Sequence, residues 1–488
     1  MKRTVVPIPK KSKLVLVGNG MSGYKFCEKF LKYHLYKKFD LVIYGEESRP
    51  AYDRVNLTRY FTSPGELTLA PASWYKENNM LLKTGEDVTY INRVEKWIRT
   101  RRGTIEYYDK LILATGSSPF IPAIEGLNNP HVFVYRTIDD LVAIKERMCG
   151  CGSALVIGGG ILGLEAARAV LHSGLTTTIV EIANHLMPRQ LDFEGAKLLQ
   201  SQIEALGVKV LVDKKVIRLT GKEGGIEVGC ADGATLNTDM VIIAAGITPR
   251  DDLAVSGGLT TGIKGGIVVN NYMLTSDPHI SAIGECAMAH NRIWGLAAPC
   301  YEMADVLAAR LANIYKVFRG DALFTKLKVL ETRVAFIGDG MDADNSQRHY
   351  SVIESHAGVY KRITVSGDGK QLLGAILIGD ISAYSNLLHM VRSRVRIPDD
   401  PMLLICNPQT QGKSSVGDWP EDTIICLCES VSKKTITDTI TVGGIARLDQ
   451  IKKMTHAGTG CESCTNVIEE IINLYKEHAK HNVNETKL

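Results

Sequence analysis

Four cysteines near the C-terminus have a spacing that can bind a metal centre. Cys426 and Cys428 are separated by one residue and Cys461 and Cys464 by two, with 32 residues between the pairs. Four thiolates suit either a structural zinc ion or a 2Fe-2S cluster. Zinc sites usually space each pair by two to four residues, so the Cys-x-Cys pair fits zinc poorly. Spacing alone nevertheless leaves both metals open.

A glycine pattern near the N-terminus can bind a dinucleotide. An apolar, strand-like segment runs into Gly18, Gly20 and Gly23 and then into a helical pattern. The glycines allow a tight turn and a close approach to a pyrophosphate, and a helix N-terminus offers unpaired amides. A second apolar strand ends at Glu46, where an acid can hold ribose hydroxyls. These residues predict a Rossmann-like unit.

The same pattern returns in the segment "SALVIGGGILGLEAARAV", with Gly158, Gly160 and Gly163. It is followed by a strand that ends at Glu181. A carboxylate at this place accepts hydrogen bonds from a free ribose 2′-hydroxyl and repels a 2′-phosphate. For a nicotinamide dinucleotide, such a unit is expected to prefer NADH to NADPH.

Each glycine unit is followed by a later strand that closes on glycine. In "YYDKLILATGSSPFIP" the closing residues are Thr115 and Gly116, and in "TDMVIIAAGITPR" the closing glycine is Gly246. This double arrangement resembles the flavoprotein reductases of the glutathione-reductase and rubredoxin-reductase fold. The resemblance covers roughly residues 12 to 320. It implies FAD at the first glycine loop and NAD(P)H at the second.

The resemblance extends to further cofactor-binding residues. In "HISAIGECA", Gly284 and Glu285 stand where the family usually has a Gly-Asp pair beside the flavin ribityl and pyrophosphate. The glutamate is one methylene longer than the usual acid. The first unit lacks the Cys-x4-Cys pair of the disulfide reductases. Hydride that reaches the flavin is therefore not expected to leave through a neighbouring dithiol.

The stretch "RPAYDRVNLTRYF" is similar to the "PYDRPPLSK" of the rubredoxin-reductase group, whose final lysine lies near the reactive face of the flavin. The resemblance makes Arg54 a cofactor-binding residue and puts Arg59 in the place of the lysine. A cation there can stabilise reduced flavin, and Glu165 can pair with it near the nicotinamide. The alternative, in which Arg59 is a solvent-facing loop residue, stays open.

The remaining chain predicts an α+β interface domain and a small helical module beyond a polar linker. The fold class is therefore α/β, with two Rossmann-like domains, the interface domain and the cysteine module. The expected boundaries are 1–149 and 273–320 for the FAD domain, 150–272 for the NAD(H) domain, 321–406 for the interface domain, 407–420 for the linker and 421–480 for the 2Fe-2S domain.

Composition excludes several classes of function. The formal net charge of +4 over 488 residues gives no basic footprint for nucleic acid. The basic start lacks the apolar stretch of a signal peptide, and no run of about 18 apolar residues predicts a membrane span. Eleven cysteines, unevenly spread, argue against a secreted disulfide framework. We expect a cytoplasmic protein, and a homodimer is compatible with the sequence.

The whole order of domains resembles the N-terminal half of the large subunit of assimilatory NAD(P)H nitrite reductase. It also resembles the related electron-transfer subunit of assimilatory nitrate reductase. The motifs include "GGGILGLEAA", "LLGAILIGD" and the cysteine segments "ICLCESVS" and "AGTGCESC". The last two are similar to the bacterioferritin-associated-ferredoxin type of 2Fe-2S domain. The Cys-x5-Cys and Cys-x3-Cys spacings of the sirohaem domains do not occur.

The resemblance implies an enzyme that uses FAD, NADH and a 2Fe-2S cluster. Electrons would pass from NADH to a partner nitrate or nitrite reductase catalytic subunit. One alternative is an NADH diaphorase or oxidase that serves another acceptor. Another is a flavoprotein in which the four cysteines bind zinc in a docking module. The sequence assigns no role to the pair Cys149 and Cys151.

Overall fold

The structure is a computed structural model. It describes residues 11–320, 324–338, 346–406, 416–426, 429, 431–444, 447–459 and 464–485. Packing divides the chain into two compact units: Met1–Ser118 with Ile247–Gly320, and Pro119–Gly246 with Asp321–Leu488. This division is coarser than the domains expected above, whose boundaries stay a prediction. Residues 119–149 pack with the second glycine loop because β9 (Val132–Val134) pairs with β16 (Val241–Ile243).

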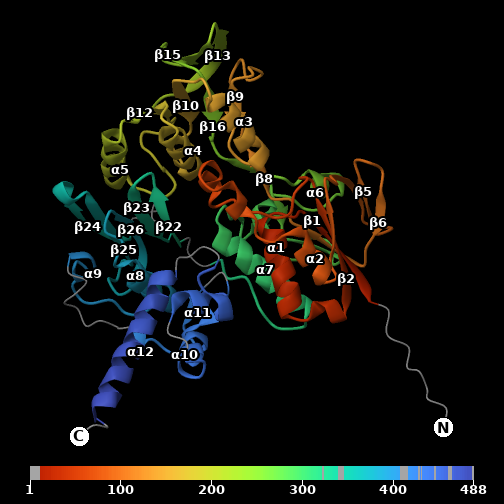
Figure 1. Ribbon diagram of the computed structural model, residues 1–488, viewed down its shortest axis with the longest axis vertical. Coiled ribbons are helices and arrows are strands. Elements are labelled where there is room, and N and C mark those ends of the chain that lie inside the picture. Colours follow the sequence, from red (N-terminus) through yellow and green to blue (C-terminus); the bar gives the residue numbers. More distant parts are fainter. Residues whose placement is uncertain are drawn as a thin grey trace. The chain divides into compact units, whose positions relative to one another are not determined.

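The first unit is built on a parallel five-stranded sheet in the order β19-β7-β1-β2-β3. Its central strand is apolar and buried, with Leu14, Val15 and Leu16 fully covered, as strands with helices on both faces require. The strands are β1 (Ser12–Val17), β2 (Phe39–Gly45), β3 (Leu81–Thr84), β7 (Lys110–Leu113) and β19 (Ile280–Ala282). Figure 1 shows that β1 and β2 come from the red, N-terminal part of the chain.

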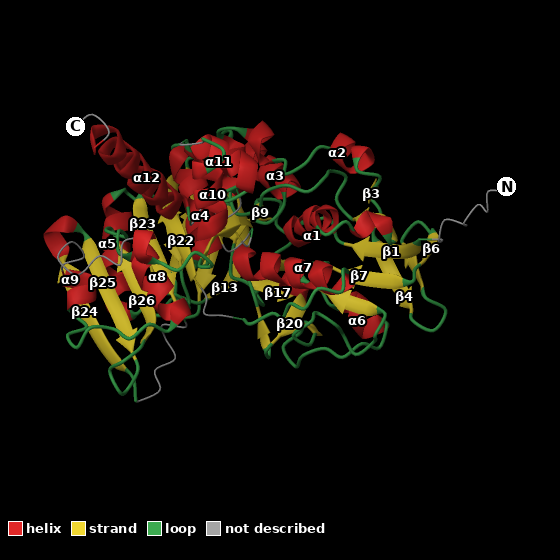
Figure 2. Cartoon of the chain, turned by 90° about the horizontal axis from the view of Figure 1, so that it is seen from below, coloured by secondary structure: helices red, strands yellow, loops and turns green. Residues whose placement is uncertain are grey.

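Two long helices of the first unit, α1 (Met21–Lys32) and α7 (Ala297–Leu311), pack side by side although they are far apart in sequence (Figure 2). Asp305 is buried between them and accepts a hydrogen bond from the hydroxyl of Tyr33 at 2.9 Å. The buried ammonium of Lys29 lies 3.9 Å from the same carboxylate. Removing one partner of such a pair would leave a buried charge uncompensated, so the contact fixes α1 against α7.

Smaller elements complete the first unit. An antiparallel sheet follows the order β4-β5-β6, and a second small sheet follows β18-β20-β21. Their bounds, with those of the short helices, are β4 (Val88–Asn92), β5 (Trp97–Thr100), β6 (Ile105–Tyr107), β18 (Ile267–Val268), β20 (Ala287–Ala289), β21 (Arg292–Ile293), α2 (Ala72–Glu77), α6 (Asp252–Ser256), and the 3-10 helices η2 (Leu57–Phe61) and η4 (Gly284–Cys286).

The second unit contains another parallel sheet, in the order β12-β11-β10-β16-β9. Helix α3 begins with a capping box, in which Thr137 and Asp140 each satisfy the backbone N–H of the other. Such a cap stabilises a helix by about 1 kcal/mol. The elements are β10 (Ser153–Ile157), β11 (Thr176–Val180), β12 (Lys209–Leu211), α3 (Ile138–Met148), α4 (Ile161–His172), α5 (Phe193–Ala205) and the antiparallel strands β13 (Val216–Lys222), β14 (Gly225–Cys230) and β15 (Thr235–Thr238).

A third domain follows in the same unit, with an antiparallel sheet in the order β22-β23-β26-β25-β24. Figure 2 shows its strands β24, β25 and β26 side by side, with α8 against the sheet. The buried side chains of Tyr384 and Leu387 on α8 join the core formed by the strands. The elements are β22 (Phe324–Val329), β23 (Thr332–Ile337), β24 (Arg348–Glu354), β25 (Val359–Val365), β26 (Leu372–Ile378), α8 (Tyr384–Ser393) and α9 (Leu403–Cys406).

One acid, among other contacts, joins the third domain to the second parallel-sheet domain. Asp192 caps α5 by accepting the N–H of Gly195 at 3.1 Å. Its other oxygen accepts hydrogen bonds from the hydroxyl of Tyr360 and from the guanidinium of Arg362, both on β25. A single carboxylate thus completes a helix of one domain and binds a strand of the next.

The C-terminal module is small and mostly helical. Helices α10, α11 and α12 pack on one another, and the blue end of the chain in Figure 1 shows them grouped. Their contacts bury Ile436, Ile451 and Ile468 completely. The elements are η6 (Val416–Asp418), β27 (Ile424–Cys426), β28 (Val431–Ser432), α10 (Lys433–Thr441), α11 (Leu448–Thr455) and α12 (Thr465–Glu485).

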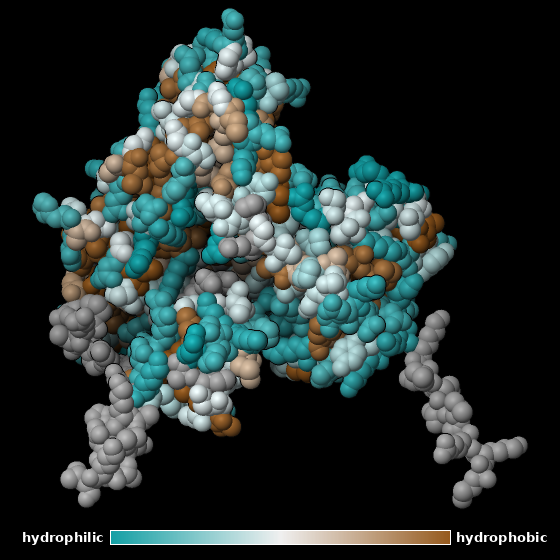
Figure 3. Space-filling model, viewed as in Figure 1, coloured by the Kyte–Doolittle hydropathy of each residue, from teal (hydrophilic) through white to brown (hydrophobic). Residues whose placement is uncertain are grey.

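The face of the molecule shown in Figure 3 is mostly hydrophilic, with hydrophobic residues in small groups. Among the described residues, none of the helices combines the length and the apolar character that a membrane crossing needs.

Candidate functional site

The first glycine loop needs glycine at two positions for steric reasons. Gly18 has a φ of +112°, and a Cβ there would lie 2.0 Å from the carbonyl oxygen of Ala114. A Cβ at Gly23 would lie 2.1 Å from the carbonyl oxygen of Gly18. These contacts bring the ends of β1 and β7 and the start of α1 together, as a dinucleotide-binding turn requires.

Steric contacts do not explain the glycine in the middle of this loop. Gly20 has ordinary extended backbone angles, and a Cβ there would meet nothing within 4 Å. It precedes α1, whose N-terminus has neither a side-chain cap nor an acid in its first turn. Neither conformation nor packing therefore requires glycine at this position. An open backbone position before an uncapped helix start fits an anionic group such as a pyrophosphate.

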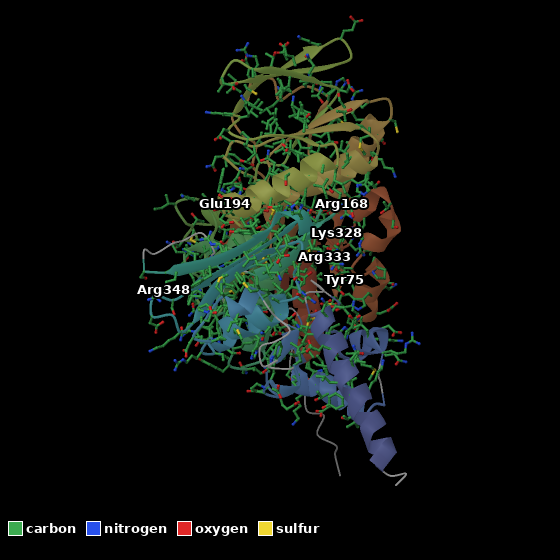
Figure 4. All side chains as sticks on the ribbon, turned by 90° about the vertical axis from the view of Figure 1, so that its left-hand side faces the viewer. Tyr75, Arg168, Glu194, Lys328, Arg333 and Arg348 are labelled. Carbon is green, nitrogen blue, oxygen red and sulfur yellow. The ribbon has the colours of Figure 1, made fainter. Side chains whose placement is uncertain are left out.

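A buried donor in the same loop also fits a ligand with acceptor oxygens. The carboxamide of Asn19 accepts a hydrogen bond from the hydroxyl of buried Tyr75 at 3.1 Å. Its Nδ2 is buried and has no partner among the described residues. Tyr75 lies on α2 and is labelled in Figure 4. A buried amide donor without a partner is costly, and a bound phosphate or hydroxyl oxygen would relieve that cost.

Gly284 lies against this loop, and Glu285 follows it; their role beside the flavin stays a prediction. Gly284 has a φ of +82°, and a Cβ there would come within 2.5 Å of the hydroxyl of Ser22, in the first turn of α1. Glu285 accepts a hydrogen bond from the hydroxyl of Ser117 at 2.6 Å. The segment after β19 and the segment after β7 are thereby joined at the start of α1.

Glu46 follows β2 and forms an ion pair with the guanidinium of Arg250, which raises the pKa of Arg250. The backbone carbonyl of Arg250 accepts a hydrogen bond from the hydroxyl of Thr115 at 2.6 Å. Its N–H donates to the carbonyl of Gly116 at 2.9 Å. Arg250 therefore links the predicted ribose acid to the closing turn of β7.

The loop that carries Arg54 and Arg59 reaches the start of α1 in part. The backbone N–H of Arg54 donates to the sulfur of Met21 at 3.4 Å. Its guanidinium pairs with Glu47 and lies 4.7 Å from the ring centroid of Tyr52. Arg59, on η2, is exposed. Arg54 thus lies beside the glycine loop, whereas the role of Arg59 stays a prediction.

The second glycine loop repeats the geometry of the first. Gly158 has a φ of +117°, and a Cβ there would lie 2.4 Å from the carbonyl oxygen of Ala244. A Cβ at Gly163 would lie 1.9 Å from the carbonyl oxygen of Gly158. At Gly160, which caps α4 with extended backbone angles, a Cβ would meet nothing within 4 Å. As at Gly20, the open glycine directly precedes a helix whose N-terminus has no side-chain cap.

Glu181 lies at the end of β11 and is directed at this loop. It is buried, and its two carboxylate oxygens accept the N–H groups of Gly159 at 2.6 Å and of Ala183 at 2.8 Å. These hydrogen bonds fix an acceptor next to the glycine turn. Gly246 has a φ of +131° and follows β16, and its carbonyl accepts the N–H of Phe120 at 2.9 Å.

Glu165 lies near the start of α4, in the second unit, and Arg59 belongs to the first. The pairing of these two side chains stays a prediction. Further along, α4 packs on the β22–β23 hairpin. There Glu331 pairs with Lys328 at 2.7 Å, and that hydrogen bond lowers the pKa of Glu331. Figure 4 labels Arg168, on α4, and Lys328 in this region.

Two of the four predicted metal ligands are among the described residues. Cys426 ends β27 and is fully buried, and Cys464 directly precedes α12 and is 5% exposed. Cys428 and Cys461 lie outside the described residues. The hydroxyl of Thr465, beside Cys464, is buried without a partner among the described residues. Two buried thiols, with an unpartnered hydroxyl at a helix start, fit an inorganic cluster whose sulfur atoms accept hydrogen bonds.

Five of the seven remaining cysteines divide into two kinds. Cys27, Cys286 and Cys300 are buried in the first unit. Burial raises the pKa of Cys27 and of Cys286. Cys149 is exposed and Cys151 is half-buried, just after α3. The thiols of the first unit are therefore poor nucleophiles.

Sequence reasoning missed Asn19, Tyr75, Ser117 and Arg250. Asn19 was within reach, because it stands between two glycines of the loop. The others are tens of residues or more from the loop in sequence, and only the folded sheet brings them to it. Arg250 and Glu46 are 204 positions apart.

Three families match successive parts of this chain. Residues 12–304 match the pyridine nucleotide-disulphide oxidoreductases. Residues 324–395 match the C-terminal domain of rubredoxin NAD+ reductase. Residues 424–473 match the BFD-like [2Fe-2S] binding domain, which includes all four predicted ligand cysteines. The cofactors predicted from sequence, a flavin, a nicotinamide dinucleotide and a 2Fe-2S cluster, are those of these families.

Curated relatives match almost the whole chain. The nitrite reductase [NAD(P)H] large subunit of Klebsiella oxytoca is 41% identical over 95% of this chain and 49% of its own length. The assimilatory nitrate reductase electron transfer subunit of Bacillus subtilis is 33% identical over 95% of this chain and 60% of its own length. The chain thus spans about half the length of the curated relatives that it matches.

A solved structure with the same fold is a ferredoxin reductase from Rhodopseudomonas palustris. It has a TM-score of 0.73 and 22% identity, and the match covers 79% of this chain and 96% of that one. The resemblance and the α/β fold class predicted from the sequence are confirmed. The chain belongs to the pyridine nucleotide-disulphide oxidoreductase family and carries a BFD-like [2Fe-2S] binding domain.

Proposed function

We propose that this protein passes electrons from NADH, through FAD and a 2Fe-2S cluster, to a partner nitrate or nitrite reductase catalytic subunit. The order of the domains along the chain supports this proposal. A flavin domain, a nicotinamide domain and an iron–sulfur module occur in one polypeptide.

The observation that carries the proposal is the pair of open glycines, Gly20 and Gly160. Each has an extended backbone that any residue can adopt, yet a Cβ would extend into space with no protein atom within 4 Å. Each stands at the N-terminus of an uncapped helix that follows a buried parallel strand. Two such positions in one chain fit two dinucleotides, one in each unit.

The chain's own residues would bind and orient these cofactors. Gly18 and Gly158 make the turns that let the backbone approach each pyrophosphate. Glu46 and Glu181 would accept ribose hydroxyls, and Arg59 would stabilise negative charge on the flavin, with Glu165 as its partner. When bound, NADH gives two electrons and one proton to FAD as a hydride, and the cluster accepts electrons one at a time.

The preference for NADH rests on Glu181. Its carboxylate is buried and held by two backbone amides, so it cannot swing away to admit a 2′-phosphate without losing both hydrogen bonds. A phosphate next to this carboxylate would be repelled, whereas a hydroxyl would donate to it.

Electrons would leave the flavin through the cluster rather than through a dithiol. The cysteines of the first unit, Cys27, Cys286 and Cys300, are all buried. Burial raises the pKa of Cys27 and Cys286, and a thiol with a raised pKa forms little of the thiolate that disulfide chemistry needs.

A nitrate or nitrite reductase catalytic subunit is proposed as the partner because of the relatives' names. One relative is called an electron transfer subunit of nitrate reductase, and another a nitrite reductase large subunit. We assign the reduction of nitrate or nitrite to the partner on the ground of these names.

The proposal is tested by a steady-state assay in which the purified protein, NADH and a candidate nitrate or nitrite reductase catalytic subunit are combined. We expect reduction of nitrate or nitrite that depends on all three components. Oxidation of NADH that is equally fast without the catalytic subunit, with no nitrate or nitrite consumed, would instead indicate an oxidase or a diaphorase.

A further inference from the structure

A parallel stack of two aromatic rings joins the third domain to the segment before the iron–sulfur module. The imidazole of His389 and the indole of Trp419 have ring centroids 4.2 Å apart and planes 7° from parallel. His389 lies on α8, and Trp419 follows η6. Residues 394–415 connect these two elements along the chain, and of these residues 407–415 lie outside the described part. The stack is thus a contact that the chain does not enforce by proximity in sequence.

Trp419 belongs structurally to the iron–sulfur module. The buried ammonium of Lys433, the first residue of α10, donates hydrogen bonds to the carbonyls of Gly417 and Trp419, both at 2.7 Å. It also pairs with the carboxylate of Glu421 at 3.0 Å. Helix η6 packs against α12, and Val416 is buried there. Lys433 therefore fixes the backbone that presents the indole.

His389 belongs equally firmly to the third domain. It lies on the same helix as Tyr384 and Leu387, which are buried in the core of the antiparallel sheet. The hydroxyl of Ser393 lies 3.4 Å from its Nδ1. Burial and the nearby Arg392 lower the pKa of His389, which favours the neutral form of the imidazole in the stack.

We propose that His389 and Trp419 form a latch that holds the iron–sulfur module on the third domain and positions it to receive electrons. The inference rests on the proposed function. Both rings are positioning residues, since neither is among the predicted ligands of the cluster. A module held on the third domain restricts the positions that the cluster can take, whereas a released module samples many.

The latch is weak enough to open. An aromatic pair of this kind shifts the equilibrium between the latched and the released module by only about fivefold. The indole Nε1 of Trp419 is buried and has no hydrogen-bond partner among the described residues. An unsatisfied buried donor destabilises the stacked arrangement. The latched arrangement therefore competes with a released one.

The test uses alanine and phenylalanine variants of both residues in the full-length protein. His389→Ala and Trp419→Ala remove the stack, whereas His389→Phe and Trp419→Phe keep it. His356→Ala is the matched control, because His356 is an exposed histidine of the same domain. Anaerobic stopped-flow mixing with NADH follows flavin bleaching and cluster reduction separately. Iron content and circular dichroism select the variants that are folded and loaded.

We expect flavin bleaching at the wild-type rate in all variants, and cluster reduction about fivefold slower in the two alanine variants. The phenylalanine variants should recover most of the rate. Wild-type cluster reduction in both alanine variants would overturn the latch. If Trp419→Ala fails to load its cluster, the rates of cluster reduction in His389→Ala and His389→Phe are compared instead. Equal rates in these two variants would overturn the latch.

A second readout does not depend on electron transfer. The protein has four tryptophans, so the emission of Trp419 is isolated by subtracting the spectrum of Trp419→Phe. His389→Ala should change the emission of the wild-type background but not that of the Trp419→Phe background. If wild-type cluster is never reduced by NADH, the proposed function fails, and this fluorescence coupling alone still supports or refutes the latch.

Discussion

The carboxylate of Glu181 accepts a hydrogen bond from the backbone N–H of Gly159, at 2.6 Å, across the second glycine turn. Gly159 has no room for a side chain, because a Cβ there would lie 2.5 Å from Leu186 and 3.1 Å from the Cβ of Glu181. The side chain of Glu181 thus packs directly against the backbone of the turn and is hydrogen-bonded to it. This relationship fixes a negative charge where the resemblance expects the adenosine ribose.

Replacing Glu181 with glutamine should weaken the preference for NADH. The amide keeps an acceptor oxygen but loses the charge that repels a 2′-phosphate. We expect the ratio of kcat/KM for NADH to that for NADPH, measured with ferricyanide as the acceptor, to fall by about tenfold or more. Glu194→Gln, an exposed acid on α5 labelled in Figure 4, is the control and should leave the ratio unchanged. An unaltered ratio in Glu181→Gln would remove this residue from cofactor discrimination.

The two glycines Gly160 and Gly163 should respond oppositely to alanine. A methyl at Gly160 meets no protein atom, so Gly160→Ala should keep or raise the free energy of unfolding by about 0.5 kcal/mol. The same methyl should obstruct the dinucleotide and raise the KM for NADH by about tenfold or more. Gly163→Ala meets a backbone carbonyl at 1.9 Å and should destabilise the second unit by about 3 kcal/mol.

Thermal unfolding and NADH titration of the two variants measure these effects. Gly20→Ala offers a parallel case in the first unit, with loss of bound flavin as its readout. A Gly160→Ala variant with wild-type KM would mean that the open space beside α4 does not receive the cofactor.

Replacing Arg59 with alanine should slow the reduction of flavin by NADH by about tenfold, because a cation near the flavin stabilises its reduced, negatively charged form. Arg59→Lys should restore most of the rate. The control is Arg101→Ala, since Arg101 is an exposed arginine of the same unit that pairs with Asp87. Stopped-flow absorbance of the flavin measures the rate, and an unchanged rate in Arg59→Ala would leave this arginine as a surface residue.

The third domain should lose stability at acid pH through Asp380. Burial raises the pKa of this acid, but hydrogen bonds from Lys361 and Ser382 outweigh it and lower the pKa to about 2. The unfolded value is 3.8, so the ionised carboxylate stabilises the fold fully above pH 4. That contribution declines as the pH falls from about 4 to about 2.

Asp380→Asn should therefore lower the melting temperature at pH 7 by more than at pH 3. Asp399→Asn is the control, because Asp399 is 95% exposed in its pair with Arg396 and should have little effect at either pH. If Asp380→Asn lowers the melting temperature equally at pH 7 and at pH 3, the ion pair with Lys361 does not cause the loss of stability at acid pH.

The local turns could be predicted from sequence, and the long-range partners could not. Glycine spacing specifies the backbone of one short loop, so Gly18, Gly23, Gly158 and Gly163 carry their own steric reason. The partner of Glu46 could not be found, because Arg250 approaches it only after the sheet has folded. Predicting that contact would require the tertiary structure.

Composition does not reveal the packing at the end of the predicted linker. The stretch 407–420 is polar and rich in glycine, serine and proline, and its composition predicts a linker. Its end instead carries Trp419, which is 6% exposed and stacked on His389. One aromatic residue in a polar stretch was the available signal, since an indole is seldom left in solvent.

The most direct test of the central claim is an anaerobic titration of the purified protein with NADH, followed by visible and EPR spectroscopy. We expect bleaching of the flavin absorbance, about two irons per chain and an EPR signal from the reduced cluster that grows with added NADH. Cys464→Ser should lose the signal, whereas Cys149→Ser should keep it. A protein that contains zinc and bleaches its flavin without any EPR signal would contradict the account.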